Sequence, residues 1–525
     1  MSAVITTETQ FAPFQNEPYA DFTKPENAAR MQAALEKVRG ELGREYPLVI
    51  AGERRQRQDK LRSLNPSRPA EVVSVHDKAN EQDARDAVEA AYAYFAEWSA
   101  VSMERRAEML AQVAAILRRR KYEFDAWLVL EAGKTWNEAE ADVAEAIDFC
   151  EYYARRAMKL AHPETLVQLR GEVDEMMYLP LGVGIVIPPW NFPLAILVGM
   201  TTAALVTGNT VVIKPSSDTP AIAAKFVETL VEAGFPQKSF SLLVGSGGAI
   251  GDVLVAHPKT RFVSFTGSRD VGLHINELAA KTPKGQVWIK RVIAEMGGKD
   301  AIIVDRDADV DEASTGVLVS AFGFQGQKCS ACSRAIVHEA IYDEFLKSLA
   351  EKAGKLKVGP SDDFANYMGP VINARAKESI LSYIETGSKE GRVIAGGGPA
   401  EGAGYFIRPT VIADVDSKAR IFQEEIFGPV LAVAKARNFD HALEMANDSE
   451  YGLTGAVYSR TRENVEKARR QFFVGNLYIN RKCTGAMVGA HPFGGFNMSG
   501  TDSKAGGPDY LLQFVQAKSI AEKVG

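Results

Sequence analysis

Cysteine is scarce in this chain of 525 residues, and the first basic residue is Lys24. The four cysteines are too few for a disulfide scaffold, which favours a reducing compartment, and we expect the cytoplasm. Without a basic N-terminal region, neither a secretory signal nor an Arg-rich transit peptide is predicted. The sequence therefore argues against the small, disulfide-stabilised secreted proteins.

An excess of positive charge is also missing. The 61 Lys and Arg residues stand against 67 Asp and Glu, a net charge of −6, so nothing predicts a nucleic-acid partner. Hydrophobic residues make up 46% of the chain, an ordinary share for a globular protein. At ~150 residues per domain, this length favours about two to four domains.

Long uninterrupted hydrophobic runs are rare, and the best candidate is broken. No charged side chain occurs over residues 176–213, a run longer than the ~20 residues that a membrane span needs. Three prolines interrupt its middle: Pro188, Pro189 and Pro193. The flanks 181–187 and 210–213 predict strands, and 194–206 predicts a helix between them. We interpret the run as a parallel crossover unit and expect no membrane segment.

Helix and strand patterns alternate along the rest of the chain. Amphipathic periodicity predicts helices at 26–44, 80–99, 103–119, 121–132 and 138–160. A strand or hairpin over 167–178 lies outside the alternation, which runs from 181 to about 290 and again from 301 to 356. Two such series predict two doubly wound α/β domains.

One cysteine has a setting suited to chemistry. Cys329 follows a glycine-containing turn, 323–328, that runs into a predicted helix start. Backbone N–H groups at such a position lower the pKa of a thiol and make it a nucleophile, although a buried, inert cysteine is the alternative. Cys329 and Cys332 have the spacing of a zinc-ligand pair, but no second pair accompanies them, so no metal is expected.

Two further turns could serve a reaction. Glu295 lies on a Gly-Gly turn before a predicted strand, where a carboxylate is either a general base or merely a loop acid. Gly267 and Ser268 end a predicted strand and open a helix, where a ligand phosphate can approach the helix N-terminus. A tight turn capped by Ser268 explains that pattern equally well.

Seven motifs occur in order between about residues 180 and 500. They are Pro189-Trp-Asn-Phe-Pro193, Lys214-Pro-Ser-Ser217, Phe265-Thr-Gly-Ser268, Glu295-Met-Gly-Gly-Lys299, Gly326-Gln-Lys-Cys329, Glu424-Glu-Ile-Phe-Gly-Pro429 and Pro492-Phe-Gly-Gly495 with Ser499-Gly500. In this set and order the chain resembles the aldehyde dehydrogenase superfamily. The resemblance implies an α/β, aldehyde dehydrogenase-like fold with two doubly wound domains and a small β oligomerisation arm.

The same resemblance implies where the domains lie. Residues 1–160 and 181–296 would form a discontinuous NAD-binding domain, and 297–496 a catalytic domain that carries the nucleophilic cysteine. Residues 161–180 and 497–525 would form the oligomerisation arm. Because exposed edge strands are stable only when paired, the arm implies a homo-oligomer, a dimer or larger.

Site roles are also implied by the resemblance. Cys329 is the nucleophile, Glu295 the base that activates water, and Asn191 with the Cys329 N–H the oxyanion hole. The implied cofactor is NAD, and its binding residues are Lys214, Ser217, Gly267, Ser268, Glu425 and Phe427. Many NAD-preferring relatives have a glutamate at the position of Ser217, so NADP stays open as a second cofactor.

Four segments, 14–18, 142–148, 321–331 and 480–489, resemble the stand-alone members that oxidise L-glutamate γ-semialdehyde to L-glutamate in proline catabolism. The implied small-molecule site holds the substrate carboxylate and ammonium with Ser330, Gly485, Ala486 and Glu145, and its aliphatic stem with Phe192 and Phe493. The alternatives are a dehydrogenase for succinate or aminoadipate semialdehyde, and a non-catalytic binding protein on the same fold. The presence of Cys329 and Glu295 argues against the last.

Overall fold

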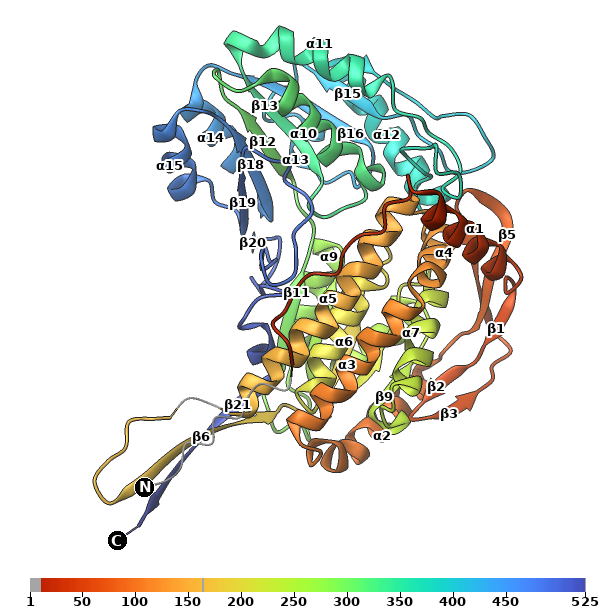
Figure 1. Ribbon diagram of the computed structural model, residues 1–525, viewed down its shortest axis with the longest axis vertical. Coiled ribbons are helices and arrows are strands. Elements are labelled where there is room, and N and C mark those ends of the chain that lie inside the picture. Colours follow the sequence, from red (N-terminus) through yellow and green to blue (C-terminus); the bar gives the residue numbers. More distant parts are fainter. Residues whose placement is uncertain (1–10, 163–164, 525) are drawn as a thin grey trace.

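The computed structural model describes residues 11–162 and 165–524 and contains two seven-stranded sheets (Figure 1). The first has the order β11-β10-β7-β8-β9-β2-β3; its five strands from β11 to β9 are parallel, and β2 and β3 add an antiparallel edge. The strand bounds are β2 (Leu48–Ile50), β3 (Glu53–Arg55), β7 (Val183–Ile187), β8 (Thr210–Ile213), β9 (Phe240–Leu242), β10 (Thr260–Thr266) and β11 (Arg291–Glu295). The predicted crossover unit of the charge-free stretch is β7, α6 and β8.

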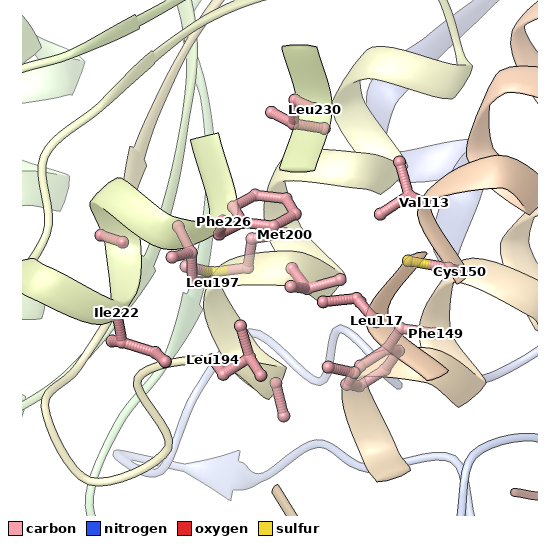
Figure 2. Close-up of a cluster of buried hydrophobic side chains, with 14 of the residues drawn as sticks. Val113, Leu117, Phe149, Cys150, Leu194, Leu197, Met200, Ile222, Phe226 and Leu230 are labelled. Atoms are coloured by element: carbon pink, nitrogen blue, oxygen red, sulfur yellow. The ribbon is translucent and has the colours of Figure 1, made fainter. Parts of the chain in front are cut away.

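Helices cover this first sheet. Their bounds are α1 (Pro25–Arg39), α2 (Glu81–Ser99), α3 (Met103–Arg119), α4 (Lys121–Ala132), α5 (Trp136–Ala161), α6 (Ala195–Val206), α7 (Pro220–Glu232), α8 (Asp252–Ala256) and α9 (Arg269–Ala280). Figure 2 shows side chains of α3, α5, α6 and α7 interlocked in one buried cluster, including Leu117, Phe149, Cys150 and Phe226. This packing holds α5 rigidly against the crossover unit.

The second sheet repeats the plan. Its order is β14-β15-β16-β13-β12-β18-β19, parallel except for the edge strand β14. The strands are β12 (Asp300–Val304), β13 (Cys332–His338), β14 (Arg392–Ala395), β15 (Thr410–Ala413), β16 (Val430–Ala436), β18 (Thr454–Tyr458) and β19 (Asn476–Ile479), and the helices are α10 (Val310–Phe322), α11 (Tyr342–Ala353), α12 (Ala374–Glu390), α13 (Arg420–Gln423), α14 (Phe439–Asn447) and α15 (Arg462–Gln471). The protein is thus built of two doubly wound α/β domains.

Between the two sheets the chain takes a short path. It leaves the carboxyl end of β11 at Glu295 and enters the amino end of β12 at Asp300. With only residues 296–299 between them, the carboxyl edge of the first sheet must face the amino edge of the second. Turns that follow strands of one sheet and precede strands of the other therefore meet in the same place.

A two-stranded ribbon extends from the body. β6 (Glu172–Pro180) pairs antiparallel with β21 (Val515–Lys523) along the full length of both strands, and Figure 1 shows the ribbon projecting away from the helices. For residues 167–178 the sequence predicted either a strand or a hairpin. The structure has a single strand there, which begins at Glu172 and pairs with a strand near the C-terminus.

Two local predictions were wrong. The helix predicted over 26–44 ends at Arg39, because the chain turns at Gly40 and enters β1 (Arg44–Tyr46). β1 pairs with β5 (Arg68–Asp77), which also pairs with β4 (Lys60–Asn65), a three-stranded sheet that the local sequence patterns did not predict. Cys329 does not open a helix: it lies in a turn just before β13. In the described part of the chain, no helix has the length and apolar character needed to cross a membrane.

Candidate active site

A cavity that opens to solvent lies where the two sheet edges meet. Elements from distant parts of the chain line it: α5, α6, β10 and β11 on one side, and the turn at 328–330 and the loops 485–488 and 503–505 on the other. Eight of the predicted site residues line this cavity together: Glu145, Phe192, Glu295, Cys329, Ser330, Gly485, Ala486 and Phe493. One space therefore contains both the predicted reacting groups and the predicted substrate anchor.

The turn that carries Cys329 has an unusual backbone. Phe324 and Gln325 adopt left-handed φ angles of 47° and 58°, a region that costs free energy for residues with a Cβ. The Gln325 side chain donates a 2.8 Å hydrogen bond to the Pro370 carbonyl, and the Gln327 carbonyl accepts one of 2.9 Å from the Asn191 amide. Buried side-chain contacts thus hold the strained turn in shape.

The environment of the Cys329 thiol differs from the prediction. Burial raises its pKa well above the ordinary value, and the negative charges of Asp300, Glu425 and Glu295 raise it further. The predicted lowering of the thiol pKa was wrong, because it considered only the local N–H groups of a helix start. The structure has no helix start at Cys329 and places acidic side chains near the thiol. The thiol therefore needs a base to become a thiolate at neutral pH.

Glu295, at the end of β11, is a suitable base. Its Oε1 accepts hydrogen bonds from the Ser503 N–H (3.1 Å) and hydroxyl (2.7 Å), and its Oε2 accepts one from the Gly495 N–H (3.0 Å). Burial raises the pKa of the carboxyl to about 7 although these bonds oppose the shift. Sequence reasoning missed Ser503, because no local pattern marks a residue that comes 208 positions later in the chain.

Asn191 follows β7 and lies behind the cysteine turn. Only one N–H of its buried amide is used by the 2.9 Å bond to the Gln327 carbonyl, two residues before Cys329. The remaining N–H is free to donate to a developing oxyanion near the thiol. The 2.9 Å bond therefore holds the Asn191 amide against the turn that carries the other predicted oxyanion donor, the Cys329 N–H.

At the far end of the cavity, charged and aromatic groups face each other. Gly485 has φ 78°, which bends the chain so that loop 484–489 turns toward the cavity. On the opposite wall, burial and the neighbouring Asp142 raise the pKa of Glu145 to about 8. The lining also contains Lys328, which pairs with Glu138 at 2.6 Å, and these two residues were not predicted.

The predicted cofactor residues are outside the lining of this cavity. Four of them follow strands of the first sheet, and two precede β16 of the second: Lys214, Ser217, Gly267 and Ser268, and then Glu425 and Phe427. Lys214 follows β8 with its ammonium buried, and its hydrogen bond to the Pro215 carbonyl is 3.5 Å long. Burial lowers the pKa of this ammonium to about 8. A buried cation with so weak a partner fits the hydroxyl groups of a ribose.

Two further turns carry the other predicted cofactor residues. Ser268 precedes α9 and makes no capping bond, so the helix N-terminus is open, which suits a pyrophosphate and disfavours the alternative of a capped turn. Glu425 Oε1 accepts a 3.0 Å bond from the Gly298 N–H, and burial raises its pKa to about 7. Phe427 (φ 56°) packs edge-on against Trp190, while Ser217 is half-buried beyond Lys214 and Gly267 lies beside Ser268. These residues fit a dinucleotide.

The zinc-ligand spacing of Cys329 and Cys332 does not lead to a metal site. Within residues 11–162 and 165–524, no cluster of three or more His, Cys, Asp or Glu side chains could hold a metal ion. Cys332 and Cys483 are both buried behind the cysteine turn, where the Cys483 thiol contacts the Ser330 carbonyl at 3.4 Å.

Together, the fold and this site define a class of protein. The sequence pattern of the Aldehyde dehydrogenase family matches residues 53–520, and the chain belongs to that family. Within it, the chain is 58% identical to the 1-pyrroline-5-carboxylate dehydrogenase of Geobacillus thermodenitrificans, over 97% of this chain and 99% of the relative.

Solved structures agree with the sequence relatives. The 1-pyrroline-5-carboxylate dehydrogenase from Thermus with bound NAD has a TM-score of 0.96 and 51% identity, covering 98% of this chain and 100% of that one. Proline utilization A from Bdellovibrio bacteriovorus, a longer protein, has a TM-score of 0.96 and 44% identity, covering 97% of this chain but 53% of that one. The predicted fold and family are thereby confirmed.

Proposed function

We propose that the protein oxidises L-glutamate γ-semialdehyde, the open form of 1-pyrroline-5-carboxylate, to L-glutamate with NAD. The observation that carries the proposal is the cavity: the thiol of Cys329 and the carboxyl of Glu295 share it with the loop at Gly485 and Ala486. The dehydrogenases similar to this chain along almost its whole length act on that substrate by name. The reaction is the second step of proline catabolism.

The chemistry starts with the thiol. Burial keeps Cys329 protonated, so Glu295, with a pKa of about 7, takes its proton as the sulfur attacks the aldehyde carbon. The new oxyanion accepts hydrogen bonds from the Asn191 amide and the Cys329 N–H. Bound NAD accepts the hydride when this thiohemiacetal collapses to a thioester. Glu295 passes the thiol proton to solvent and, ionised again, takes a proton from the water that attacks the thioester. When the C–S bond breaks, the acid is released and the leaving sulfur takes that proton from Glu295, which restores the thiol.

The substrate end is bound by opposite charges. The backbone N–H groups of Gly485 and Ala486 and the Ser330 hydroxyl hold the α-carboxylate. Glu145 faces the α-ammonium, and because its pKa is raised to about 8 by burial, an approaching cation favours its ionised form. Phe192 and Phe493 enclose the aliphatic stem between the two ends.

Three residues bind the cofactor in this proposal. The Lys214 ammonium bonds the adenosine ribose and the Ser268 hydroxyl bonds the pyrophosphate. The Glu425 carboxylate bonds the nicotinamide ribose. Gly267 lets the backbone approach the phosphates, and Phe427 packs near the ring. Ser217 supplies a hydroxyl and no negative charge, so a 2′-phosphate meets no repulsion there. NAD is the proposed cofactor, supported by the Thermus relative with bound NAD, and NADP stays open as a second one.

One assay tests this function. NADH formation is measured with pyrroline-5-carboxylate, succinate semialdehyde, aminoadipate semialdehyde and glutaraldehyde under identical conditions. We expect the highest kcat/KM for pyrroline-5-carboxylate, because only glutamate semialdehyde places both charges at the right distance from the aldehyde. A higher kcat/KM for another semialdehyde would assign the enzyme to that substrate, and no turnover of any aldehyde would favour a binding protein.

The domain division and assembly are part of the proposal. Two separate sheets support the NAD-binding (1–160, 181–296) and catalytic (297–496) domains, of which residues 1–10 lie outside the described part. The β6–β21 ribbon supports the arm (161–180, 497–525), apart from residues 163, 164 and 525. Among the described residues neither strand pairs with a third one, and Val173 and Met177 are exposed on the ribbon. We expect a homodimer or larger, and a monomer by light scattering would contradict this.

The four cysteines are all unpaired, which supports the cytoplasm as the compartment.

A further inference from the structure

Residues 11–22, which we call the N-terminal strap, lie before the part of the chain that matches the family pattern, since that match begins at residue 53. The strap runs along α5 in an extended conformation (Figure 1). Four contacts fix it on the outside: the Ala12 carbonyl to Arg155, Glu17 to Arg118, the Pro18 carbonyl to Lys121 and the Ala20 N–H to Glu140, all at 2.7–2.8 Å. It is therefore an ordered part of the fold.

The inner side of the strap bridges two walls of the cavity. The Asn16 amide donates to Asp148 Oδ2 on α5 at 2.7 Å and to the Val488 carbonyl on loop 484–489 at 3.0 Å. The Glu17 N–H adds a 2.7 Å bond to the other oxygen of Asp148. Asp148 and Val488 both line the cavity, so a single side chain ties its two sides together.

Aromatic residues lie on either side of Asn16. The Phe14 ring packs against Tyr152 of α5 at 5.1 Å and also lies next to Gly489, where an added Cβ would come within 3.0 Å of it. The Tyr19 hydroxyl contacts the Met487 sulfur at 3.5 Å, and Tyr19 lines the cavity while 55% exposed. Phe14 and Asn16 thus join α5 to the loop, and Tyr19 adds a further contact to the loop.

In the proposed function, on which this inference rests, the two walls bind different charged groups of the substrate. The wall on α5 carries Glu145, one helical turn before Asp148, and the loop carries Gly485 and Ala486. The distance between Glu145 and the backbone of Gly485 and Ala486 decides which ligand can contact both, with an ammonium at Glu145 and a carboxylate at the loop. We infer that the N-terminal strap is a specificity element: through Asn16 and Tyr19 it fixes that separation and so selects aldehydes that carry a carboxylate and an ammonium at the far end.

Asn16→Ala removes both bridging bonds without touching the reacting groups, so Asn16 is tested as a positioning residue. The readout is the ratio of kcat/KM for glutamate semialdehyde to that for propanal, which has no charged end. We expect this ratio to fall about tenfold through KM, the size of one lost hydrogen bond to a charged group. Turnover of propanal should change by less than about twofold, because the Cys329 turn is spared.

Asn27→Ala is the matched control. Asn27 also makes two hydrogen bonds in the N-terminal part, to the Asp21 carbonyl and from the Tyr122 hydroxyl, but it is outside the cavity lining. Its ratio should stay at the wild-type value. Tyr19→Ala is a second variant for the case that Asn16→Ala does not fold, since Tyr19 is exposed, and it should lower the ratio in the same direction.

The outcomes separate the two proposals. An unchanged ratio in Asn16→Ala and Tyr19→Ala, or an equal loss for both aldehydes, would overturn the strap as a specificity element while the wild-type preference for glutamate semialdehyde stands. A wild-type enzyme that does not prefer glutamate semialdehyde would overturn the proposed function. In that case a lowered ratio for its preferred charged aldehyde over propanal would still support the strap.

Discussion

The two seven-stranded sheets share one plan but present opposite ends to the cavity. The first contributes residues at the carboxyl ends of its strands: Asn191 after β7, Lys214 after β8 and Glu295 at the end of β11. The second contributes residues at the amino ends of its strands: Cys329 before β13 and Glu425 before β16. Binding at the carboxyl ends of parallel strands is general for open α/β sheets, whereas the proposed nucleophile, Cys329, lies at amino ends.

This difference shows how each sheet supplies part of one proposed site. Residues 296–299 join β11 to β12 directly, so the two edges must meet. The proposed nucleophile, Cys329, belongs to the second sheet and the proposed base, Glu295, to the first, so substitutions on the two edges should have different effects. Five substitutions or conditions test that division, and their expected effects decrease from the nucleophile to the pH profile.

Removing the nucleophile should have the largest effect. Cys329→Ala should leave less than about 1% of the dehydrogenase rate, because no thioester can form. NAD binding, measured by calorimetry, should stay near the wild-type Kd, since the cofactor residues belong to other turns. More than a few per cent residual activity would contradict the assignment of the nucleophile.

Glu295→Gln should slow turnover by about 10²–10⁴-fold through loss of the general base. The isosteric amide keeps the packing against Ser503 and Gly495 but cannot take a proton. Glu295 takes the thiol proton in the first half of the proposed reaction and activates water in the second, so both the single-turnover burst of NADH and steady turnover should fall. A burst that keeps its wild-type rate while steady turnover is lost would contradict the role of Glu295 in thiol deprotonation.

Ser330→Ala tests the substrate end of the second sheet. Losing one hydroxyl donor to a carboxylate costs roughly 1–3 kcal/mol in kcat/KM for glutamate semialdehyde. Propanal has no carboxylate, so its kcat/KM serves as an internal control and should change little. A bulky residue at Ala486 should lower the same ratio by pushing the loop away; an unchanged ratio in both variants would place the anchor elsewhere.

Gly297→Ala tests the junction between the sheets. An added Cβ would lie 2.1 Å from Glu425 Oε2, so the carboxylate must move away from the cofactor edge. We expect KM for NAD to rise about tenfold, the size of one charge-assisted hydrogen bond. At Gly251 an added Cβ meets nothing within 4 Å, and Gly251→Ala is the control with an unchanged KM.

The smallest effect is that of pH on deacylation. A carboxyl acts as a base only when ionised, and the pKa of Glu295 is raised to about 7. The deacylation rate should therefore fall about threefold from pH ~7.5 to ~6.5 and level off above pH ~8. The burst rate should follow the same limb, because Glu295 also takes the proton of Cys329, whose pKa is raised well above its ordinary value. If the deacylation rate instead fell only near the ordinary pKa of a glutamate, this would contradict a raised pKa of the buried Glu295.

Much of this protein could be read from local sequence. The charge-free stretch with its prolines determined the β7–α6–β8 crossover, because buried parallel strands and the helix between them need uncharged side chains. The alternating series determined two doubly wound domains, and the order of the motifs determined the family. Motifs alone predicted roles for Glu295, Cys329 and Ser330, and the structure brings all three to one cavity, while their roles stay predictions.

Only the tertiary structure decided the rest, and the physical reason is sequence distance. β6 pairs with β21, more than 300 positions away, and no local pattern selects such a partner. Asn16 and Val488 meet across 472 residues, so the strap's contact with the substrate loop has no sequence signal. The pKa of Cys329 is raised instead of lowered because folding buries the thiol and brings Asp300, Glu425 and Glu295 near it, and a buried charge is governed by all its neighbours in space.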